Sequence, residues 1–275
     1  MNSTTPDPSS SKKCSLISSY YQKKIKKICD EKESPIILAL DFQSDLHFST
    51  NSIVKLLNLI KENICAIKIN FHLMLSLSIN DLTQINKIAH SFNLLSIADI
   101  KLNDIGNTNK ITITNLKQLG FDAVIINPFI GLTETQTLVS YSHSIDFGVI
   151  SLVYMSHTTS HQGYGLNILI DKNVPTRLLH NKIDSIPMYK LLYDYGKLSH
   201  IDGVVIGATK LDIIKEFDFK DDKIPIYSPG LVNQGGDIVK TFLAGTDYAI
   251  VGRHIINSPD PKQTVIDMLT LLKNN

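Results

Sequence analysis

Three acidic and two basic side chains lie in or just after short apolar runs of this sequence. The segment ADIKLND places Asp99 and Lys101 two residues apart, so that on a strand both point to the same face, and Asp104 follows three residues later. Asp41 ends an earlier apolar run, and Lys68 lies in the run between them. Packed charges of both signs cost stability through desolvation, and such a cost usually has a functional reason. We therefore expect a charged catalytic cluster, with a purely structural ring of salt bridges as the alternative.

A second group of residues has the composition of a phosphate-binding site. The segment SPGLVNQGGD, residues 228–237, contains three glycines whose backbone can approach a ligand closely, and a helix is expected directly after it. The segment VGR adds Gly252 and Arg253, whose forked guanidinium suits a phosphate. Gly-Gly is first of all a turn signal, so only the two motifs together indicate phosphate binding.

A long polar stretch, MSHTTSHQGYGLN at residues 155–167, follows another apolar run. Its Ser, Thr, His and Gly residues suit a mobile lid, and an ordinary surface loop is the alternative. No third ligand at a defined spacing accompanies His157 and His161, so we interpret them as loop histidines rather than as metal ligands.

The elements that must position these residues repeat in a regular order. Each apolar run is short and is followed by a segment with helical periodicity, as in the stripe of Ile53, Leu56, Leu57 and Ile60. The runs cover residues 35–41, 65–70, 94–101, 121–127, 146–154, 202–208, 224–230 and 247–252. The helices are expected over 49–63, 81–92, 108–119, 133–143, 186–197, 211–217 and 236–243, with a last one on the stripe Val265, Met268, Leu269 and Leu272.

Eight such units predict a closed TM (β/α)8 barrel of the α/β class. The runs are continuously apolar, as expected of parallel strands that are buried on both faces. About 250 residues suffice for this fold, whose active site lies at the carboxyl ends of the strands. The competing open, doubly wound sheet usually has a glycine-rich first turn, which LALDFQSD lacks. We predict one barrel domain over residues 34–275 after a tail over 1–33.

The tail carries a charge of its own. It holds seven lysines and four acidic residues, so its net charge is +3, and the chain's total of +1 leaves −2 for the remainder. We expect disorder over residues 1–15 and a short basic helix over 16–30 that packs on the barrel, and binding of an anionic partner is the alternative.

Composition excludes several classes of protein. The near-neutral charge argues against nucleic-acid binding, and no apolar run approaches the roughly 18 residues that span a membrane. The spacing of Cys14, Cys29 and Cys65 fits neither a disulfide framework nor a zinc site. The N-terminus lacks a secretory h-region, so we expect a cytoplasmic protein.

The segment from Asp99 to Thr108, DIKLNDIGNT, closely resembles the Asp-x-Lys-x-x-Asp-Ile-x-x-Thr signature of the orotidine 5′-phosphate decarboxylase family. LALD, IKIN, MSH, SPGLVNQGGD and VGR follow that family's order and spacing. The resemblance covers residues 35 to about 272 and is greatest to the compact microbial and archaeal branch. The stretch after Ser156 departs from the family's usual Pro-Gly continuation, which puts individual lid contacts in doubt.

The resemblance implies a homodimer that converts orotidine 5′-monophosphate to UMP and CO2 in de novo pyrimidine biosynthesis, without metal or organic cofactor. It implies a catalytic array of Lys68, Asp99, Lys101 and Asp104, of which Asp104 reaches into the partner's site. It also implies a set of substrate-binding residues, which contact the ribose, the pyrimidine or the phosphate, in part across the dimer. These residues are Asp41, Ile105, Thr108, Ser156, Pro229, Gln234, Gly235, Gly252 and Arg253.

Loss of CO2 leaves a carbanion at C6 of the pyrimidine with no adjacent π-system to absorb the charge. A preorganised cation beside that carbon stabilises it and can then protonate it, and Lys101 is the candidate donor. Two other functions stay open. One is a Mg²⁺-dependent sister enzyme, such as a ketogulonate-phosphate decarboxylase or a hexulose-phosphate synthase, and the other is a catalytically silent phosphate-binding barrel that acts through its basic tail.

Overall fold

The structure is a computed structural model that describes residues 19–42, 49–179, 183–218, 223–232 and 234–274. Eight parallel strands close into a barrel in the order β1-β10-β9-β8-β5-β4-β3-β2. Each strand coincides with one of the apolar runs, with β3 extending one residue beyond its run to Leu102, and the closure confirms the barrel over the open sheet. The strands are β1 (Ile36–Leu40), β2 (Ala66–Asn70), β3 (Leu95–Leu102), β4 (Ala123–Ile126), β5 (Gly148–Tyr154), β8 (Gly203–Ile206), β9 (Ile226–Pro229) and β10 (Tyr248–Val251).

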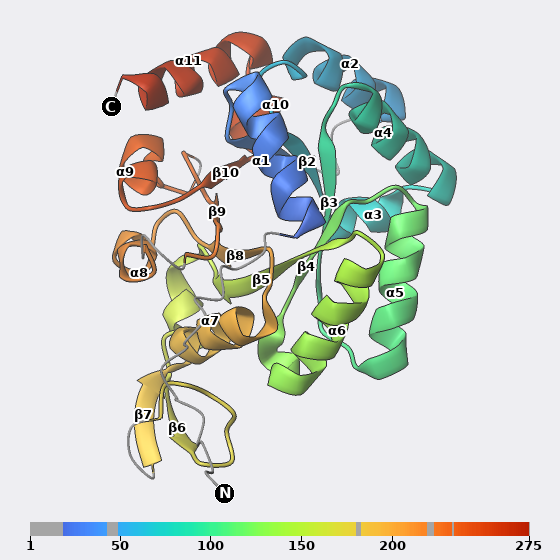
Figure 1. Cartoon of the computed structure of the whole chain (residues 1–275). Coiled ribbons are helices and arrows are strands. Elements are labelled where there is room, and N and C mark those ends of the chain that lie inside the picture. Colours follow the sequence, from blue (N-terminus) through green and yellow to red (C-terminus); the bar gives the residue numbers. More distant parts are fainter. Residues whose placement is uncertain (1–18, 43–48, 180–182, 219–222, 233, 275) are drawn as a thin grey trace, which may run out of the picture.

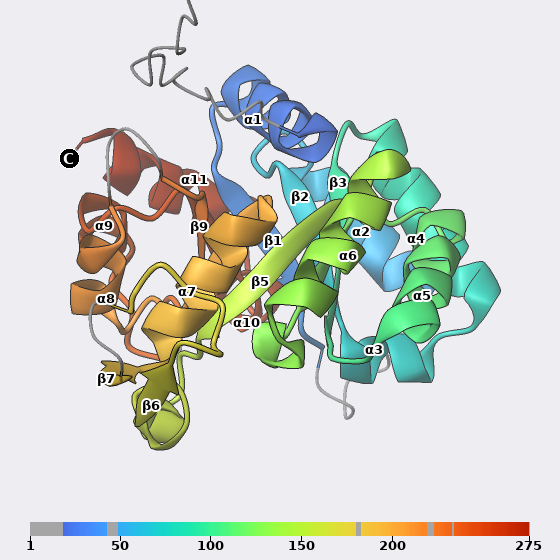
Figure 2. The same ribbon diagram turned by 60° about the horizontal axis from the view of Figure 1, so that its bottom comes forward.

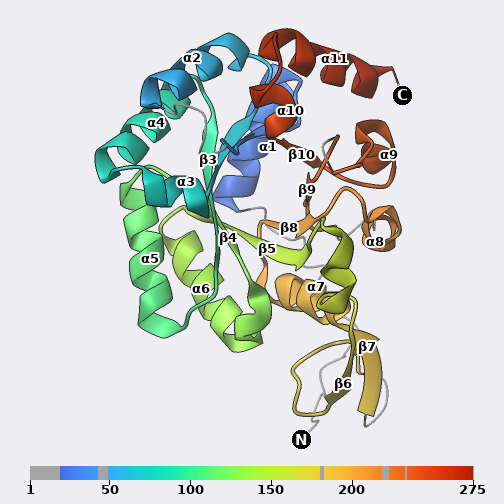
Figure 3. The ribbon, with the colours of Figure 1, turned by 180° about the vertical axis from the view of Figure 1, so that it is seen from behind.

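Helices surround these strands, as the front and rear views show (Figures 1 and 3). Those that follow the eight strands are α2 (Thr50–Ile60), α4 (Ile79–Ser91), α5 (Gly106–Gln118), α6 (Leu132–Ser144), α7 (Met188–Ser199), α8 (Leu211–Glu216), α9 (Ile238–Leu243) and α11 (Pro261–Lys273). Four short helices were not expected from the sequence: α3 (Phe71–Ser76), α10 (Arg253–Ile256), and the 3-10 turns η1 (Pro128–Ile130) and η2 (Thr158–Gln162).

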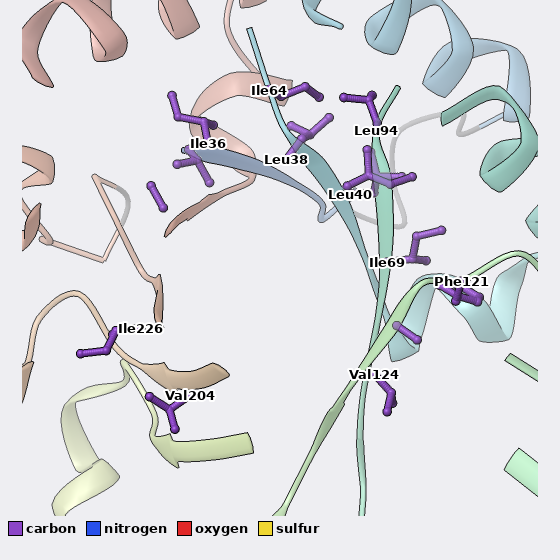
Figure 4. Close-up of a cluster of buried hydrophobic side chains, with 14 of the residues drawn as sticks. Ile36, Leu38, Leu40, Ile64, Ile69, Leu94, Phe121, Val124, Val204 and Ile226 are labelled. Carbon is purple, nitrogen blue, oxygen red and sulfur yellow. The ribbon is translucent and has the colours of Figure 1, made fainter. Parts of the chain in front are cut away.

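Side chains of each strand alternate between two layers of core. Ile36, Leu38 and Leu40 of β1 belong to the large cluster between the barrel and its helices (Figure 4). Ile37 and Ala39, from the same strand, belong to a second cluster inside the barrel. Because both faces of each strand are buried, the runs are apolar throughout rather than alternating.

The basic segment of the tail forms helix α1 (Tyr20–Lys32), which lies across the amino ends of the strands (Figure 2). Ser19 caps it in a capping box with Gln22, and Tyr21 reaches into the cluster inside the barrel. Lys24 of α1 forms an ion pair of 3.0 Å with Asp122, which precedes β4. The disorder expected over residues 1–15 lies outside the described residues.

An antiparallel hairpin, β6 (Asn167–Asp171) and β7 (Ile183–Pro187), lies where no strand was predicted from the sequence. It lies at the end of the barrel opposite α1 (Figure 2). Ile170 packs on one side with Leu132 of α6 and Leu191 of α7. The hairpin was missed because its two strands are mostly exposed or half-buried and mix polar with apolar residues, unlike the unbroken runs of the barrel, and because eleven residues, 172–182, separate them.

Among the described residues, no helix is long and apolar enough to cross a membrane.

Candidate active site

Most of the chemically interesting side chains meet at the carboxyl ends of the strands. Asp41 follows β1, Lys68 and Asn70 belong to β2, and Asp99 and Lys101 belong to β3. All five line one cavity of about 450 Å³. Because these ends converge at one mouth of the barrel, four of the five predicted charged residues line this cavity, whereas Asp104 does not.

Asp99 is the centre of the charged array. Its Oδ2 lies 2.7 Å from Nζ of Lys68, and its Oδ1 lies 2.9 Å from Nζ of Lys101. Lys68 and Asp99 are buried, with 5% and 9% of their surfaces exposed, whereas Lys101 is open to the cavity. Burial disfavours ionisation of the Asp99 carboxyl, but the charges and hydrogen bonds of Lys68 and Lys101 prevail and hold its pKa below the ordinary value.

The backbone is strained where β3 presents the second lysine. Lys101 has φ = 47°, in the left-handed region that residues other than glycine rarely adopt. The pairing of β3 with β4 also shifts register between Ala98 and Leu102. Bulges of this kind re-aim side chains and gather at functional sites. The bend therefore turns the Lys101 ammonium group onto Asp99.

Asn70 links the charged array to the next acid, a role that sequence reasoning missed. Its Oδ1 accepts a hydrogen bond from Nζ of Lys68, and its Nδ2 donates to Oδ1 of Asp41 at 3.1 Å. An asparagine at the end of a strand is commonplace, so its type alone carried no signal. Only the pairing of Asn70 with Asp99 across β2 and β3 brings it into the site.

Arg253 extends the same chain of contacts to the far end of the cavity. Its Nε lies 3.4 Å from Oδ2 of Asp41, and His72 lies 3.7 Å from the other oxygen of that carboxylate. Gly252 allows this approach, since a Cβ there would lie 3.1 Å from Cβ of Asp41. Arg253 and His254 make this end of the cavity suitable for an anion, because both line it and carry nitrogen donors.

The glycine-rich segment after β9 closes another side of the cavity. Pro229, Gly230 and Gln234 line it, whereas Gly235 is exposed and lines neither cavity described here. Gly230 has φ = 92°, and a Cβ on it would lie 2.7 Å from Oε1 of Gln234 and 2.8 Å from Cβ of Ser156. Glycine is thus required where the loops after β5 and β9 meet.

A second cavity of about 200 Å³ shares Lys68, Asp99 and Lys101 with the first. Its other walls are mostly apolar, with Ser156 and His157 at the loop after β5, and they comprise Ile125, Leu152, Met155, Val205, Pro229 and Ile250. The charged array therefore stands between a polar compartment and an apolar one. A flat ring with a phosphorylated sugar would find chemically matched surroundings in the two.

Besides Gly235, three further predicted site residues lie away from both cavities of this chain. Asp104, Ile105 and Thr108 are exposed, Ile105 to 63% of its surface. Their segment is nevertheless fixed, because the amide of Ile105 donates to Asp104 at 2.8 Å and that of Gly106 donates to Glu134 at 2.9 Å.

Across the described parts of the chain, no group of three or more His, Cys, Asp or Glu side chains has the geometry of a metal site. His157 lies beside the apolar cavity and His161 is exposed.

A model of the orotidine 5′-phosphate decarboxylase / HUMPS family matches residues 34–268. Proteins named orotidine 5′-phosphate decarboxylase are similar in sequence. That of Thermoplasma acidophilum is 30% identical over 229 residues, which cover 83% of this chain and 91% of the relative. That of Pyrococcus abyssi is 28% identical, with 83% and 94% covered.

Solved structures show the same likeness. The orotidine 5′-monophosphate decarboxylase of Methanocaldococcus jannaschii, complexed with inhibitor BMP, is 25% identical with a TM-score of 0.69, and 86% of this chain and 97% of that chain are covered. The putative decarboxylase of Plasmodium yoelii has a TM-score of 0.77 at 20% identity, with 92% and 98% covered, which shows the shared fold.

Proposed function

Because the chain belongs to the orotidine 5′-phosphate decarboxylase / HUMPS family, we propose that it converts orotidine 5′-monophosphate to UMP and CO2, a step of pyrimidine nucleotide synthesis. The observation that carries this proposal is the bridging of Asp99 by Lys68 and Lys101 at the boundary of the two compartments. The names of the archaeal relatives support the same activity.

Each part of this substrate has a place. The phosphate lies near Gln234, Gly252 and Arg253, where the guanidinium supplies charge. The ribose hydroxyls lie against Asp41 and Lys68. The pyrimidine enters the apolar compartment beside Ser156, so that C6 and its carboxylate face the charged array. In this pose Pro229 contacts the ring and Gly235 shapes the phosphate loop.

The reaction then needs a positively charged group beside C6 of the pyrimidine. The bond between C6 and the carboxylate carbon breaks, CO2 departs, and the electron pair stays on C6. The Lys101 ammonium stabilises this pair and transfers one proton to C6, which gives UMP and a neutral lysine. Asp99 holds Lys101 in position, and its own charge lies near the departing carboxylate.

We propose that no metal or organic cofactor takes part. Mg²⁺ prefers carboxylate and water oxygens. In this site both oxygens of Asp99 already accept hydrogen bonds from lysine ammonium groups, so a divalent cation would have to displace a lysine.

We propose further that the protein is a cytoplasmic homodimer without a nucleic-acid partner. In the dimer Asp104, Ile105 and Thr108 complete the site of the neighbouring protomer. Their exposure in a single chain supports this arrangement, as do the large exposed side chains of Phe71 and Leu75 on the adjacent α3.

The test is to mix the purified full chain with orotidine 5′-monophosphate and to follow the ultraviolet absorbance change. Turnover that survives EDTA supports the proposal, and Lys101→Ala protein is the control for contaminating activity. No turnover at all would reject the proposal. Turnover that chelation abolishes would reject the metal-independent reaction.

A further inference from the structure

We propose that the β6–β7 hairpin is a brace for the loop of residues 155–163, which carries Ser156 and His157 over the apolar compartment. Tyr164 and Tyr189, at the base of the hairpin, are the positioning residues. Only the identity of the ring that occupies the compartment rests on the proposed function.

The chain connects the two features directly. The loop leaves β5 after Tyr154, and the hairpin begins as soon as the loop ends. The amide of Tyr189 donates to the carbonyl oxygen of Tyr164 at 3.0 Å, and that of Met188 donates to Leu166 at 2.8 Å. These bonds continue the hairpin ladder down to its base, where Asn167 pairs with Pro187. The far end of the loop is thereby fastened to the chain that enters α7.

Three tyrosines lock this junction. The Tyr154 ring centroid lies 5.7 Å from that of Tyr164 and 5.6 Å from that of Tyr189, within the range of favourable aromatic pairs. The Tyr189 hydroxyl also donates to Glu216 at 2.8 Å. A Cβ on Gly165 would lie 3.0 Å from the Tyr154 hydroxyl oxygen, so the hairpin base passes directly against the end of β5.

The loop is also held from within and from below. Ser160, which is 1% exposed, donates its hydroxyl to the carbonyl oxygen of His157 at 2.6 Å. The Thr209 hydroxyl donates to the carbonyl oxygen of Ser156 at 3.0 Å. A Cβ on Gly207 would lie 2.4 Å from Cα of Ser156, so the loop packs directly against the chain after β8 and cannot move closer to it. These contacts support a lid that is held in place, whereas the sequence suggested a mobile one.

The hairpin itself is anchored firmly enough to serve as a brace. Asp194 of α7, which is 4% exposed, accepts hydrogen bonds from the Thr176 hydroxyl at 2.7 Å and from the amide and Nε of Arg177 at 3.0 and 3.1 Å. Ile170 adds apolar packing with Leu132. The loop therefore stands in place before a ligand enters, which is the condition for precise recognition of the ring.

Tyr164→Ala removes one ring of the lock and leaves both cavities intact. Tyr164→Phe keeps the ring and should behave as wild type, and Leu169→Ala, on the exposed face of the hairpin, is the matched control. Hydrogen exchange should quicken at least about tenfold over residues 155–163 in Tyr164→Ala and stay unchanged in the barrel strands. Should that variant fail to fold, Tyr164→Leu keeps the apolar volume without the ring.

Binding measured by calorimetry distinguishes loss of the brace from a general defect of the folded protein. UMP carries the ring that the loop faces, whereas ribose 5-phosphate occupies only the polar compartment. We expect UMP to bind Tyr164→Ala about tenfold more weakly than wild type and ribose 5-phosphate to bind equally well.

Unchanged exchange over residues 155–163 would overturn the brace, and so would equal weakening of both ligands. Neither measurement needs turnover. A wild-type protein that fails to decarboxylate orotidine 5′-monophosphate would therefore refute the proposed function and leave the brace to be judged by exchange alone.

Discussion

The ammonium group of Lys68 lies 2.7 Å from Oδ2 of Asp99, and both side chains are almost wholly buried. A buried pair is costly to break, and without Lys68 the buried carboxylate of Asp99 would keep only the partly exposed Lys101 as its cation. Lys68→Met should therefore lower the free energy of unfolding by about 3 kcal/mol, as measured by urea denaturation. The double variant with Asp99→Asn should regain most of that loss. Additive effects in the two single variants would show that the pair is not coupled.

Lys101 makes a different prediction, because its ammonium is open to the cavity and is not part of the buried core. Lys101→Ala should lower kcat by at least about a thousandfold, since both the stabilising cation and the proton donor are lost. The unfolding midpoint and the affinity for UMP should change little. Near-wild-type turnover would exclude Lys101 as the donor.

Asn70 should matter through the two charged groups that it joins. Asn70→Ala removes its hydrogen bonds to Lys68 and Asp41, and kcat/KM should fall about 10- to 100-fold. His72→Ala is the matched control, because His72 lines the same cavity but reaches only Asp41, at 3.7 Å, and is exposed. If the two variants lose activity equally, Asn70 has no special positioning role.

The barrel could be predicted from the sequence because strands that are buried on both faces consist of unbroken apolar runs. The positions of Asp41, Lys68, Asp99 and Lys101 followed from that, since carboxyl ends of the strands share one mouth. Nothing in the sequence distinguished Asn70 from an ordinary residue at the end of a strand, because its role depends on register across two strands.

Two other features lay beyond sequence reasoning for physical reasons. The left-handed backbone of Lys101 is imposed by a register shift between β3 and β4, which side-chain types do not reveal. The lock of Tyr154, Tyr164 and Tyr189 joins residues up to 35 positions apart, so their type and local spacing suggested only a polar loop.

The exposed segment of Asp104 offers a test of the shared site. Asp104→Ala and Lys101→Ala proteins should each be nearly inactive. When they are mixed and allowed to exchange subunits, one site of each heterodimer should hold both native residues and regain activity, up to about a quarter of the wild-type value in a statistical mixture. Heterodimer formation is verified by native mass spectrometry with one protein isotopically labelled. A flat response despite heterodimers would contradict the shared site.

Stability should also depend on pH through His143 and Asp202 at the amino ends of the strands. Nε2 of His143 lies 3.0 Å from Oδ2 of the fully buried Asp202. This hydrogen bond raises the pKa of His143 against the opposing effect of partial burial. Folding therefore favours the imidazolium, and its contribution is complete below the unfolded pKa of about 6.5 and is lost as pH rises through the higher folded value.

His143→Gln keeps a hydrogen-bond donor but removes the titrating charge. At pH 5.5 the variant should be less stable than wild type by about 1 kcal/mol, because the wild-type imidazolium pairs with Asp202. At pH 9 the difference should shrink toward zero, since the imidazole is then neutral in both the folded and the unfolded chain. Urea denaturation at pH 5.5, 7 and 9 measures this trend. A difference that is constant or grows with pH would show that His143 gives no charge-dependent stability.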